Sequence, residues 1–417
     1  MIYKKKKIYD IDIYGCHSKK YLAKYLSDSK NDLYIKTSEL RNVDANFHGK
    51  GKVFYKSKLT GEKFTEEPPD YTTSKYRKFN DAQNKHKRIL KRINYYLNQI
   101  ELPSYYFSKE DYCYKYNATY HKGNTKFILM DIQSFFPNCT FKYIKDFCCN
   151  ESGLNLVKRK KVNDESILYE MDIADIFARL VTAPKKSNVN NRIIPQGYPT
   201  STNISFLAYK EMFDEIYNYV NTFNYKFSVY VDDLTISYKE EMISPKELIE
   251  HIISILKKYG HTSNSKKIHI IDIEKKVRNK KSGNEQIMAP IITGIFLKRY
   301  IVKASPKIHK KMNRMFNKVN SAGLPRNSKE YIKNWKNFNS LVGLYHTIEF
   351  IEPRNKLKRK RVKELINKKS KCYLKSVSIS RINQLKWQDK IFSAYKSDSL
   401  NQFYKKNKRV LADHKSK

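Results

Sequence analysis

Two adjacent acidic residues, Asp232 and Asp233, interrupt an apolar and β-branched stretch that runs from Phe227 to Tyr238. The pattern predicts two short strands joined by a tight turn that carries both carboxylates. Burying two neighbouring carboxylates costs free energy unless a positive charge neutralises them. Mg²⁺ binds carboxylate oxygens together with substrate phosphates, and two such ions can hold the attacking and leaving oxygens of a phosphoryl transfer. The alternative is a solvated Asp-Asp turn in an ordinary hairpin, because motifs this short recur by chance.

A third carboxylate, Asp131, ends the near-continuous apolar run that begins at Lys126. Such a run predicts a buried strand. Phe135 and Phe136 follow it directly. A single aspartate at a strand end is usually a cap or turn residue, but together with the pair at 232 and 233 Asp131 becomes the missing metal ligand.

The chain is strongly basic. It contains 83 Lys and Arg residues against 41 Asp and Glu, for a formal net charge of +42, and it is rich in Tyr (33) and Phe (21). A charge of this size favours a polyanionic partner, with nucleic acid as the first candidate, and the aromatic rings add surfaces on which bases can stack. Codon bias from an AT-rich genome would supply Lys and Tyr, but it does not explain the imbalance between basic and acidic residues.

Cysteine usage and hydropathy indicate the compartment. The six cysteines have no CxxC pair and no zinc-ligand spacing, so we expect reduced thiols in a cytoplasmic protein. The basic residues Lys4 to Lys7 are not followed by the apolar segment of a signal peptide, and no stretch approaches the length of a membrane span.

The elements that must position the carboxylates are predicted from periodicity and capping signals. Lys50 to Pro69 favours a loop, or a hairpin around Leu59 to Gly61. The other expected elements are helices over 76–97, 143–149, 172–180, from the turn at 195–197 to 220, and 244–259; strands over 126–131, within 227–238, 268–271 and 290–298; and basic helices over 308–319, 329–351 and 354–371.

Four motifs stand in a fixed order along the chain. Asp131 is followed five residues later by Phe136, Pro195 to Gly197 opens a helix, Tyr230 to Asp233 forms the acidic turn, and Gly260 to Lys267 follows a helix. This order resembles the palm motifs of reverse transcriptases over about Tyr76 to Pro353. The resemblance implies an α+β, right-hand polymerase fold with an antiparallel palm sheet. It also implies an N-terminal extension (1–75), fingers and palm (76–300, with an insertion at 150–172), and a basic α-helical thumb and C-terminal region (301–417).

Two shorter elements are similar to those of the bacterial retron and retron-like, defence-associated (unknown-group) reverse transcriptases. Asn117 and His121 match their Asn-Ala-x-x-His element, and Thr293-Gly294 matches their Val-Thr-Gly element with Ile in place of Val. The long N-terminal region and the separation of 101 residues from Asp131 to Asp232 depart from a minimal retron enzyme. Both departures suggest extra surfaces for RNA, protein or self-assembly, and they keep the wider defence-associated group as a competitor.

By this resemblance Asp131, Asp232 and Asp233 are the catalytic carboxylates. Together with the carbonyl of Ile132 they would hold two Mg²⁺ ions, for which Mn²⁺ is a substitute. The metals would lower the pKa of the primer hydroxyl and stabilise the pyrophosphate leaving group.

Other residues receive substrate roles by the same resemblance. Phe136 is expected to act as a steric gate that selects the sugar, and Gln196 and Gly197 are expected to line the nucleotide or template side. Arg77 is expected to bind the triphosphate, and Lys267, with Lys266 as the alternative, to protonate pyrophosphate. Tyr230 and Val231 are expected to support the primer end.

The function implied is RNA-directed synthesis of cDNA from a structured noncoding RNA, with dNTPs as substrates, in antiphage defence. An effector protein or a second copy of the chain is an expected partner, and a membrane is not. Three alternatives stay open: a defence-associated reverse transcriptase with protein-primed or repeat-synthesising chemistry, a catalytically dormant RNA-binding scaffold, and an RNA-templated RNA polymerase. Phe136 disfavours the last of these, and the intact aspartates disfavour the scaffold.

Overall fold

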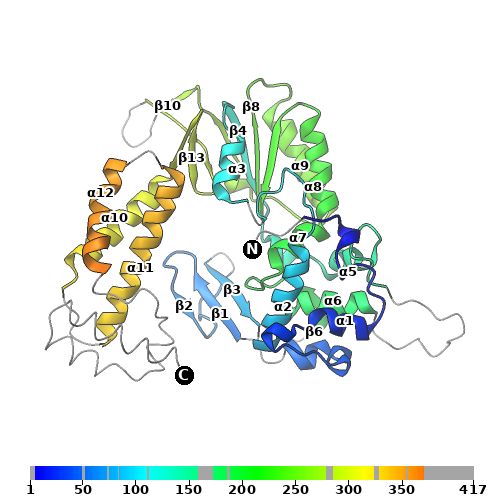
Figure 1. Cartoon of the computed structure of the whole chain (residues 1–417). Helices are drawn as coiled ribbons and strands as arrows, with labels where there is room; N and C mark the ends of the chain where they lie inside the picture. The colour runs from blue at the N-terminus through cyan, green and yellow to red at the C-terminus, as the bar shows by residue number, and fades with distance from the viewer. Residues whose placement is uncertain are drawn as a thin grey trace, which may run out of the picture. The chain divides into compact units, whose positions relative to one another are not determined.

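The computed structural model describes residues 5–48, 52–72, 75–82, 84–109, 112–157, 172–185, 188–278, 285–323, 328–353 and 356–370. The chain divides into two compact units, Met1–Met288 and Ala289–Lys417. The first unit contains all three aspartates, so it contains the candidate site. Figure 1 labels the helices and strands of both units.

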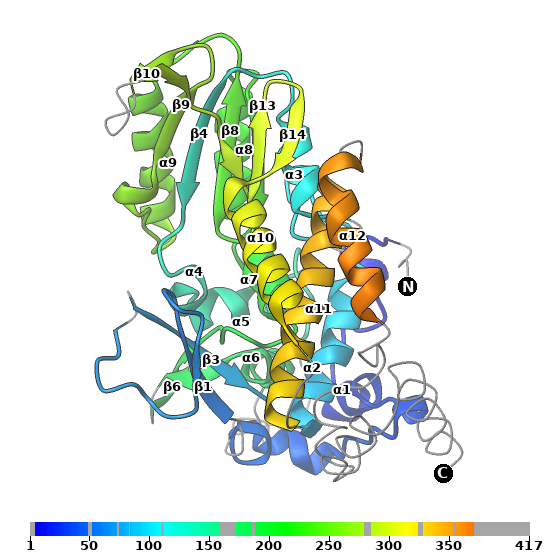
Figure 2. The ribbon, with the colours of Figure 1, turned by 90° about the vertical axis from the view of Figure 1, so that its left-hand side faces the viewer.

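A four-stranded antiparallel sheet lies in the first unit. Its order is β7 (Lys226–Tyr230), β8 (Asp233–Tyr238), β4 (Lys126–Asp131) and β9 (His269–Asp272). Figure 2 shows β8, β4 and β9 side by side. The central strands are apolar because they are covered on both faces; Phe127, Ile128 and Ile236 are fully buried. The structure therefore confirms the predicted acidic hairpin and the buried strand before Asp131.

Helices pack against this sheet and against one another. Both α8 (Lys210–Asn221) and α3 (Tyr114–Tyr120) contact β7, and α8 also contacts α9 (Pro245–Lys258). The predicted helix over 244–259 is α9, whose N-cap Ser244 accepts a hydrogen bond from the Glu247 N–H. The predicted continuous helix up to 220 is wrong, because α7 (Ser201–Ala208) ends at Tyr209 and α8 starts a new helix.

A second antiparallel sheet has the order β2 (Lys63–Phe64), β1 (Lys52–Ser57) and β3 (Tyr76–Asp81). The hairpin alternative for Lys50 to Pro69 is confirmed. The prediction of helix from residue 76 is wrong, because Tyr76–Asp81 pairs along its whole length with β1; the helix, α2, is confined to Asn84–Leu97. Since β1 pairs with β3 and lies before residue 75, the predicted boundary at that residue does not separate two folding units.

The other elements of the first unit complete its helical layer and loops. They are α1 (Lys19–Leu26), α4 (Phe135–Asn138), α5 (Phe141–Cys149), α6 (Ile173–Val181), β5 (Ala183–Lys185), β6 (Asn188–Ile193), β10 (Lys276–Arg278), β11 (Glu285–Ile287) and short 3₁₀ or π turns at 8–10, 29–31, 37–41, 44–48 and 265–267. Most of the predicted insertion at 150–172 lies outside the described residues.

The second unit contains a three-stranded sheet of β12 (Ile291–Ile292), β13 (Ile295–Lys298) and β14 (Ile301–Ala304), followed by α10 (Pro306–Ser321), α11 (Ser328–Ile351) and α12 (Lys356–Ser370). The predicted single strand over 290–298 is wrong: Thr293 and Gly294 both have positive φ and turn β12 into β13. The predicted boundary at residue 300 falls inside the β13–β14 hairpin, so the division lies earlier, after Met288. The three predicted basic helices are confirmed over the residues described.

Five of the six cysteines lie among the described residues, and all five are free. Cys148 is fully buried, as expected of a core residue. Within the described part of the chain, no helix is long and apolar enough to cross a bilayer.

Candidate active site

The three aspartates meet at one end of the palm sheet, which is the sheet β7-β8-β4-β9. Asp131 is the last residue of β4 and lies directly opposite Asp233, the first residue of β8. Asp232 occupies the turn between β7 and β8, and its carbonyl accepts a hydrogen bond from the Ile132 N–H at 2.9 Å. Residues that are 101 positions apart in the sequence therefore become neighbours through strand pairing alone.

The segment after α9 holds Asp131 from the other side. The Asp131 carbonyl accepts hydrogen bonds from the Asn264 N–H at 3.3 Å and from the Ser263 hydroxyl at 3.2 Å. The Lys267 ammonium lies 2.7 Å from Oδ2 of Asp131. The structure thus brings Lys267, rather than Lys266, to the carboxylates.

Burial and neighbouring carboxylates raise the pKa values of Asp232 and Asp233. Burial raises the pKa of Asp232, and the charge of Asp131 raises it further. For Asp233, burial and then the charges of Asp232 and Asp131 raise the pKa to about 7. Lys267 and Arg77 lower both values but do not cancel the effect. Partly buried carboxylates with raised pKa values are typical of functional sites that bind a cation.

The donor set fits Mg²⁺ in its chemistry, because it consists of hard carboxylate oxygens. Among the residues that the structure describes, no three His, Cys, Asp or Glu side chains are already arranged as a metal-binding group. In the ion pair between Lys267 and Asp131, the ammonium group contacts Oδ2 of Asp131, which is one of the carboxylate oxygens that would bind the metal ions. Ile132 is fully buried behind Asp131, and the role of its carbonyl stays a prediction.

His121 supports the acidic hairpin from within. Its ring is fully buried; Nε2 lies 2.7 Å from the hydroxyl of Ser228 on β7, and Nδ1 lies 2.7 Å from the hydroxyl of Ser237 on β8. Burial lowers the pKa of His121 to about 3, so the ring is neutral and donates one hydrogen bond and accepts the other. Asn117, one helical turn earlier, is also buried. Asn117 and His121 therefore lie behind the acidic turn and not in it.

The turn itself is strained. Val231 has a φ of 61°, a left-handed conformation that a β-branched residue rarely adopts. Tyr230 is half-buried, and burial raises the pKa of its hydroxyl. Both residues flank the carboxylates as predicted, and their contact with a primer stays a prediction.

Arg77 lies on β3, and its positive charge lowers the pKa values of Asp232 and Asp233. Lys58 lies in the turn between β1 and β2 and interacts electrostatically with the same site. Burial lowers the pKa of Lys58, the charges of Arg77 and Lys267 lower it further, and the charge of Asp131 raises it. The sequence reasoning missed Lys58. A lysine near the tip of a predicted basic hairpin was the available signal.

Gln196 and Gly197 are docked onto β3. The Asn80 N–H donates to the Gln196 carbonyl at 3.0 Å. Gly197 has a φ of 119°, and a Cβ atom there would lie 2.9 Å from the Asn80 carbonyl oxygen. The turn therefore requires glycine and is held close to the strand that carries Arg77. Phe136, half-buried in α4, is the fifth residue after Asp131.

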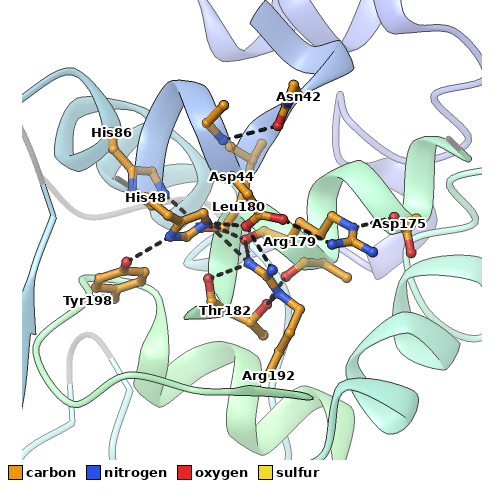
Figure 3. A network of polar contacts seen from close by, with 12 residues as sticks. Asn42, Asp44, His48, His86, Asp175, Arg179, Leu180, Thr182, Arg192 and Tyr198 are labelled. Carbon is orange, nitrogen blue, oxygen red and sulfur yellow. Dashed lines mark hydrogen bonds and ion pairs between the residues drawn. The ribbon is translucent and has the colours of Figure 1, made fainter. Parts of the chain in front are cut away.

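A buried polar network fixes the segment that leads into this turn (Figure 3). Arg192 on β6 donates to Asp44 Oδ1 at 2.8 Å and to the hydroxyl of Thr182 at 2.8 Å. Arg179 donates to the other oxygen of Asp44 at 3.0 Å and to Asp175 at 2.7 Å. Burial raises the pKa of Asp44, but the hydrogen bond and charge of Arg192 outweigh it and hold that pKa below its usual range.

Two histidines extend the network. His48 Nε2 lies 2.9 Å from the carbonyl of Arg179, and His86 Nε2 lies 2.8 Å from the carbonyl of Leu180. The Tyr198 hydroxyl lies 3.4 Å from His48 Nδ1. Tyr198 directly follows Gly197, so the network connects the N-terminal region with the turn that carries Gln196. Sequence patterns gave no signal for this connection.

The remaining pair of family elements, Thr293 and Gly294, forms the β12–β13 turn of the second unit. The Gly294 carbonyl accepts a hydrogen bond from the Ser305 N–H at 3.2 Å, which ties this turn to the start of α10. The first unit by itself thus contains the aspartates and every other predicted site residue.

An α+β fold with one aspartate at the end of a central strand and two at the adjoining hairpin defines the palm of a nucleic-acid polymerase. Residues 68–283, slightly more than half of the chain, match the family described as reverse transcriptase (RNA-dependent DNA polymerase). The chain belongs to this family.

Comparison with other proteins adds little to this assignment. No curated protein sequence is significantly similar to the chain. Among solved structures, the chain is similar to a telomerase from Candida albicans in complex with a TWJ fragment of telomeric RNA (12% identity, TM-score 0.35, 80% of this chain and 61% of that chain). It is also similar to a foamy viral protease-reverse transcriptase in complex with an RNA/DNA hybrid (13% identity, TM-score 0.35, 79% and 32%). The chain spans less than two thirds of either relative, and no argument rests on these likenesses.

Proposed function

We propose that this protein is an RNA-directed DNA polymerase that copies a structured noncoding RNA into cDNA in the bacterial cytoplasm. The observation that carries the proposal is the pairing of Asp131 with Asp233, beside Asp232, in a chain of the reverse transcriptase family. The excess of 42 positive charges supports a nucleic-acid partner.

In this proposal Asp131, Asp232 and Asp233 would hold two divalent ions, which supply Lewis-acid activation of the primer hydroxyl and stabilise charge on the leaving pyrophosphate. Lys267, 2.7 Å from Asp131, would deliver a proton to the leaving group. Arg77 and Lys58 would orient the triphosphate by charge. Phe136 would exclude a ribose 2′-hydroxyl. The Pro195–Gly197 turn would line the nucleotide or template side, and Tyr230 and Val231 would support the primer end.

A retron or retron-like role in antiphage defence is the finer part of the proposal. It is supported by the match of Asn117, His121, Thr293 and Gly294 to retron elements. The competing proposal is a defence-associated reverse transcriptase that uses a protein primer or synthesises repeats. An effector protein or a second copy of the chain is the proposed partner.

The first test is nucleotide incorporation by the double variant Asp232→Asn/Asp233→Asn. We expect it to lose Mg²⁺-dependent dNTP incorporation on an RNA template by about 10³-fold or more, because the ligands for both ions are weakened. RNA binding should be retained. The adjacent, exposed pair Glu240→Gln/Glu241→Gln is the matched control and should extend a primer normally.

A double variant that still extends the primer would contradict the assignment of the site. Wild-type protein that binds RNA but incorporates no dNTP with Mg²⁺ or Mn²⁺ would instead favour the dormant scaffold. Sequencing the nucleic acid that copurifies with the protein separates the two finer proposals: we expect DNA complementary to one structured RNA, whereas DNA attached to protein would favour protein priming.

A further inference from the structure

An open groove lies in the first unit, outside the aspartate cluster. Its volume is about 1010 Å³, at the upper end of the range for ligand sites. It is formed by the start of α5 with the residues before it, by the β5–β6 hairpin, and by the residues that follow α9.

The groove is lined by four basic side chains, and none of the described residues that line it is acidic. Arg192 donates a hydrogen bond to Asp44 (Figure 3). Lys145 lies 3.5 Å from Asp175. Lys142 and Lys185 are exposed, and neither forms a hydrogen bond or ion pair within the described residues. Among the residues that the structure describes, two exposed ammonium groups without an acidic partner therefore line a groove whose described lining carries no negative charge.

Two walls of the groove continue directly into the catalytic cluster. Pro137 and Asn138, on one wall, immediately follow Phe136. Thr262, on the other wall, accepts a hydrogen bond through its carbonyl from the Gln133 N–H at 2.8 Å, two residues after Asp131. A ligand in the groove would therefore be next to the strand end that carries Asp131.

The lining chemistry selects phosphate rather than bases. Single-stranded nucleic acid is usually bound by aromatic rings on which bases stack, together with positive charge. Phe141 is the one aromatic residue among the described residues of the lining, and the guanidinium groups of Arg179 and Arg192 lie 5.7 and 5.8 Å from its ring centre. The remaining polar side chains, Asn138, Thr140, Asn191 and Thr262, are neutral hydrogen-bonding groups suited to phosphate oxygens.

We propose that this groove binds the polyphosphate group of a nucleotide, either on the incoming nucleoside triphosphate before it reaches the aspartates or on the pyrophosphate product as it leaves. The proposal rests on the proposed function for the origin of the ligand. It adds Lys142 and Lys185 as binding residues outside the cluster formed by Asp131, Asp232 and Asp233.

The direct test is binding of inorganic pyrophosphate to the full chain in the Asp232→Asn/Asp233→Asn background, measured by titration calorimetry. We expect Lys142→Glu/Lys185→Glu to weaken binding by about tenfold or more, because two charge-assisted contacts become repulsive. The control Lys20→Glu/Lys246→Glu changes the net charge equally at two exposed sites and should bind like the parent. Thermal unfolding of all variants checks that they are folded.

The active enzyme distinguishes the two sources of polyphosphate. If the nucleotide uses the groove, Lys142→Glu/Lys185→Glu raises the KM for dNTP about tenfold while kcat stays within about twofold of the control. If the product uses it, inhibition by added pyrophosphate weakens and KM is unchanged. Either result supports the groove.

Three results would overturn the proposal: no pyrophosphate binding by the parent, equal affinities in the reversal and control variants, or a loss of RNA affinity without a change in pyrophosphate affinity. The last result would make the groove a nucleic-acid contact. If wild-type protein synthesises no DNA, the proposed function fails, while the pyrophosphate titration still decides the groove.

Discussion

At the scale of single residues, Asp233 shows how the fold prepares its chemistry. Burial and two neighbouring carboxylates raise its pKa to about 7, against an ordinary value near 4. The fold therefore holds a group that is partly protonated near neutral pH and that a cation would ionise. This unfavourable electrostatic arrangement distinguishes the cluster from the solvated Asp-Asp turn that the sequence left open.

The second prediction concerns the selection of deoxyribose by the ring of Phe136. If its ring excludes a 2′-hydroxyl, Phe136→Ala should admit ribonucleotides and reduce the dNTP/rNTP preference by about 10²-fold or more, since a steric clash of this kind costs several kcal/mol. Single-nucleotide incorporation with matched dNTP and rNTP gives the ratio. The control is Tyr143→Phe, which keeps the aromatic ring and should leave the ratio unchanged. Phe135→Leu is unsuitable as a control because Phe135 is buried. An unchanged ratio in Phe136→Ala would rule out the steric role.

At the scale of elements, a buried histidine, His121, supports the hairpin that carries Asp232 and Asp233. His121 joins β7 to β8 through the hydroxyls of Ser228 and Ser237, in a place that is fully buried. We infer that it positions the turn that carries Asp232 and Asp233. Its role is structural support of two strands whose ends must hold like charges close together.

The prediction is that His121→Ala lowers the free energy of unfolding by about 2–4 kcal/mol, because it leaves a cavity and two buried hydroxyls without their partner. Denaturant unfolding measures this loss. If His121 acts by positioning the turn, His121→Ala should also lower kcat. The double variant Ser228→Ala/Ser237→Ala keeps the ring but removes both of its contacts, so it should lower kcat as well, with RNA affinity unchanged in both variants. Full activity in both variants would contradict the positioning role.

The elements also show what sequence could predict. The palm strands, α9 and the basic helices followed from periodicity and capping, because local patterns determine them. Strand β3 was mistaken for helix, since its pairing with β1 is a long-range contact that no local pattern contains. The Asp44–Arg192 ion pair joins residues 148 positions apart, and nothing in either neighbourhood indicates the other. Lys58 differs from these cases, because the predicted basic hairpin around Leu59 to Gly61 was a local signal that could have indicated it.

At the scale of the whole molecule, the first unit holds four buried histidines in the neutral form. Burial lowers the pKa of His48, His86 and His261 to about 4 and that of His121 to about 3. Their pKa values in the unfolded chain are near 6.5. Below about pH 6.5 the unfolded state therefore binds more protons than the folded state, and stability falls as the pH decreases toward 4.

We expect the free energy of unfolding to fall by several kcal/mol between about pH 6.5 and 5, because each pKa unit corresponds to about 1.4 kcal/mol per group. Asp233, whose pKa is raised to about 7, contributes with the opposite sign as the pH falls, but it is one group against four histidines. Urea unfolding at a series of pH values, at constant ionic strength, measures the slope. A curve that stays flat down to pH 5 would mean that these rings are protonated in the folded protein or are accessible to water.

The ion pair between Asp44 and Arg192 has a consequence for biosynthesis. Asp44 emerges from the ribosome 148 residues before Arg192, and 135 residues before Arg179. At a translation rate of about 5–20 residues per second, this carboxylate waits roughly 7–30 seconds for its buried partner. The N-terminal segment therefore cannot reach its final state while it is being made. A nascent chain that ends before residue 192 should leave this segment open to proteases, chaperones or a partner RNA.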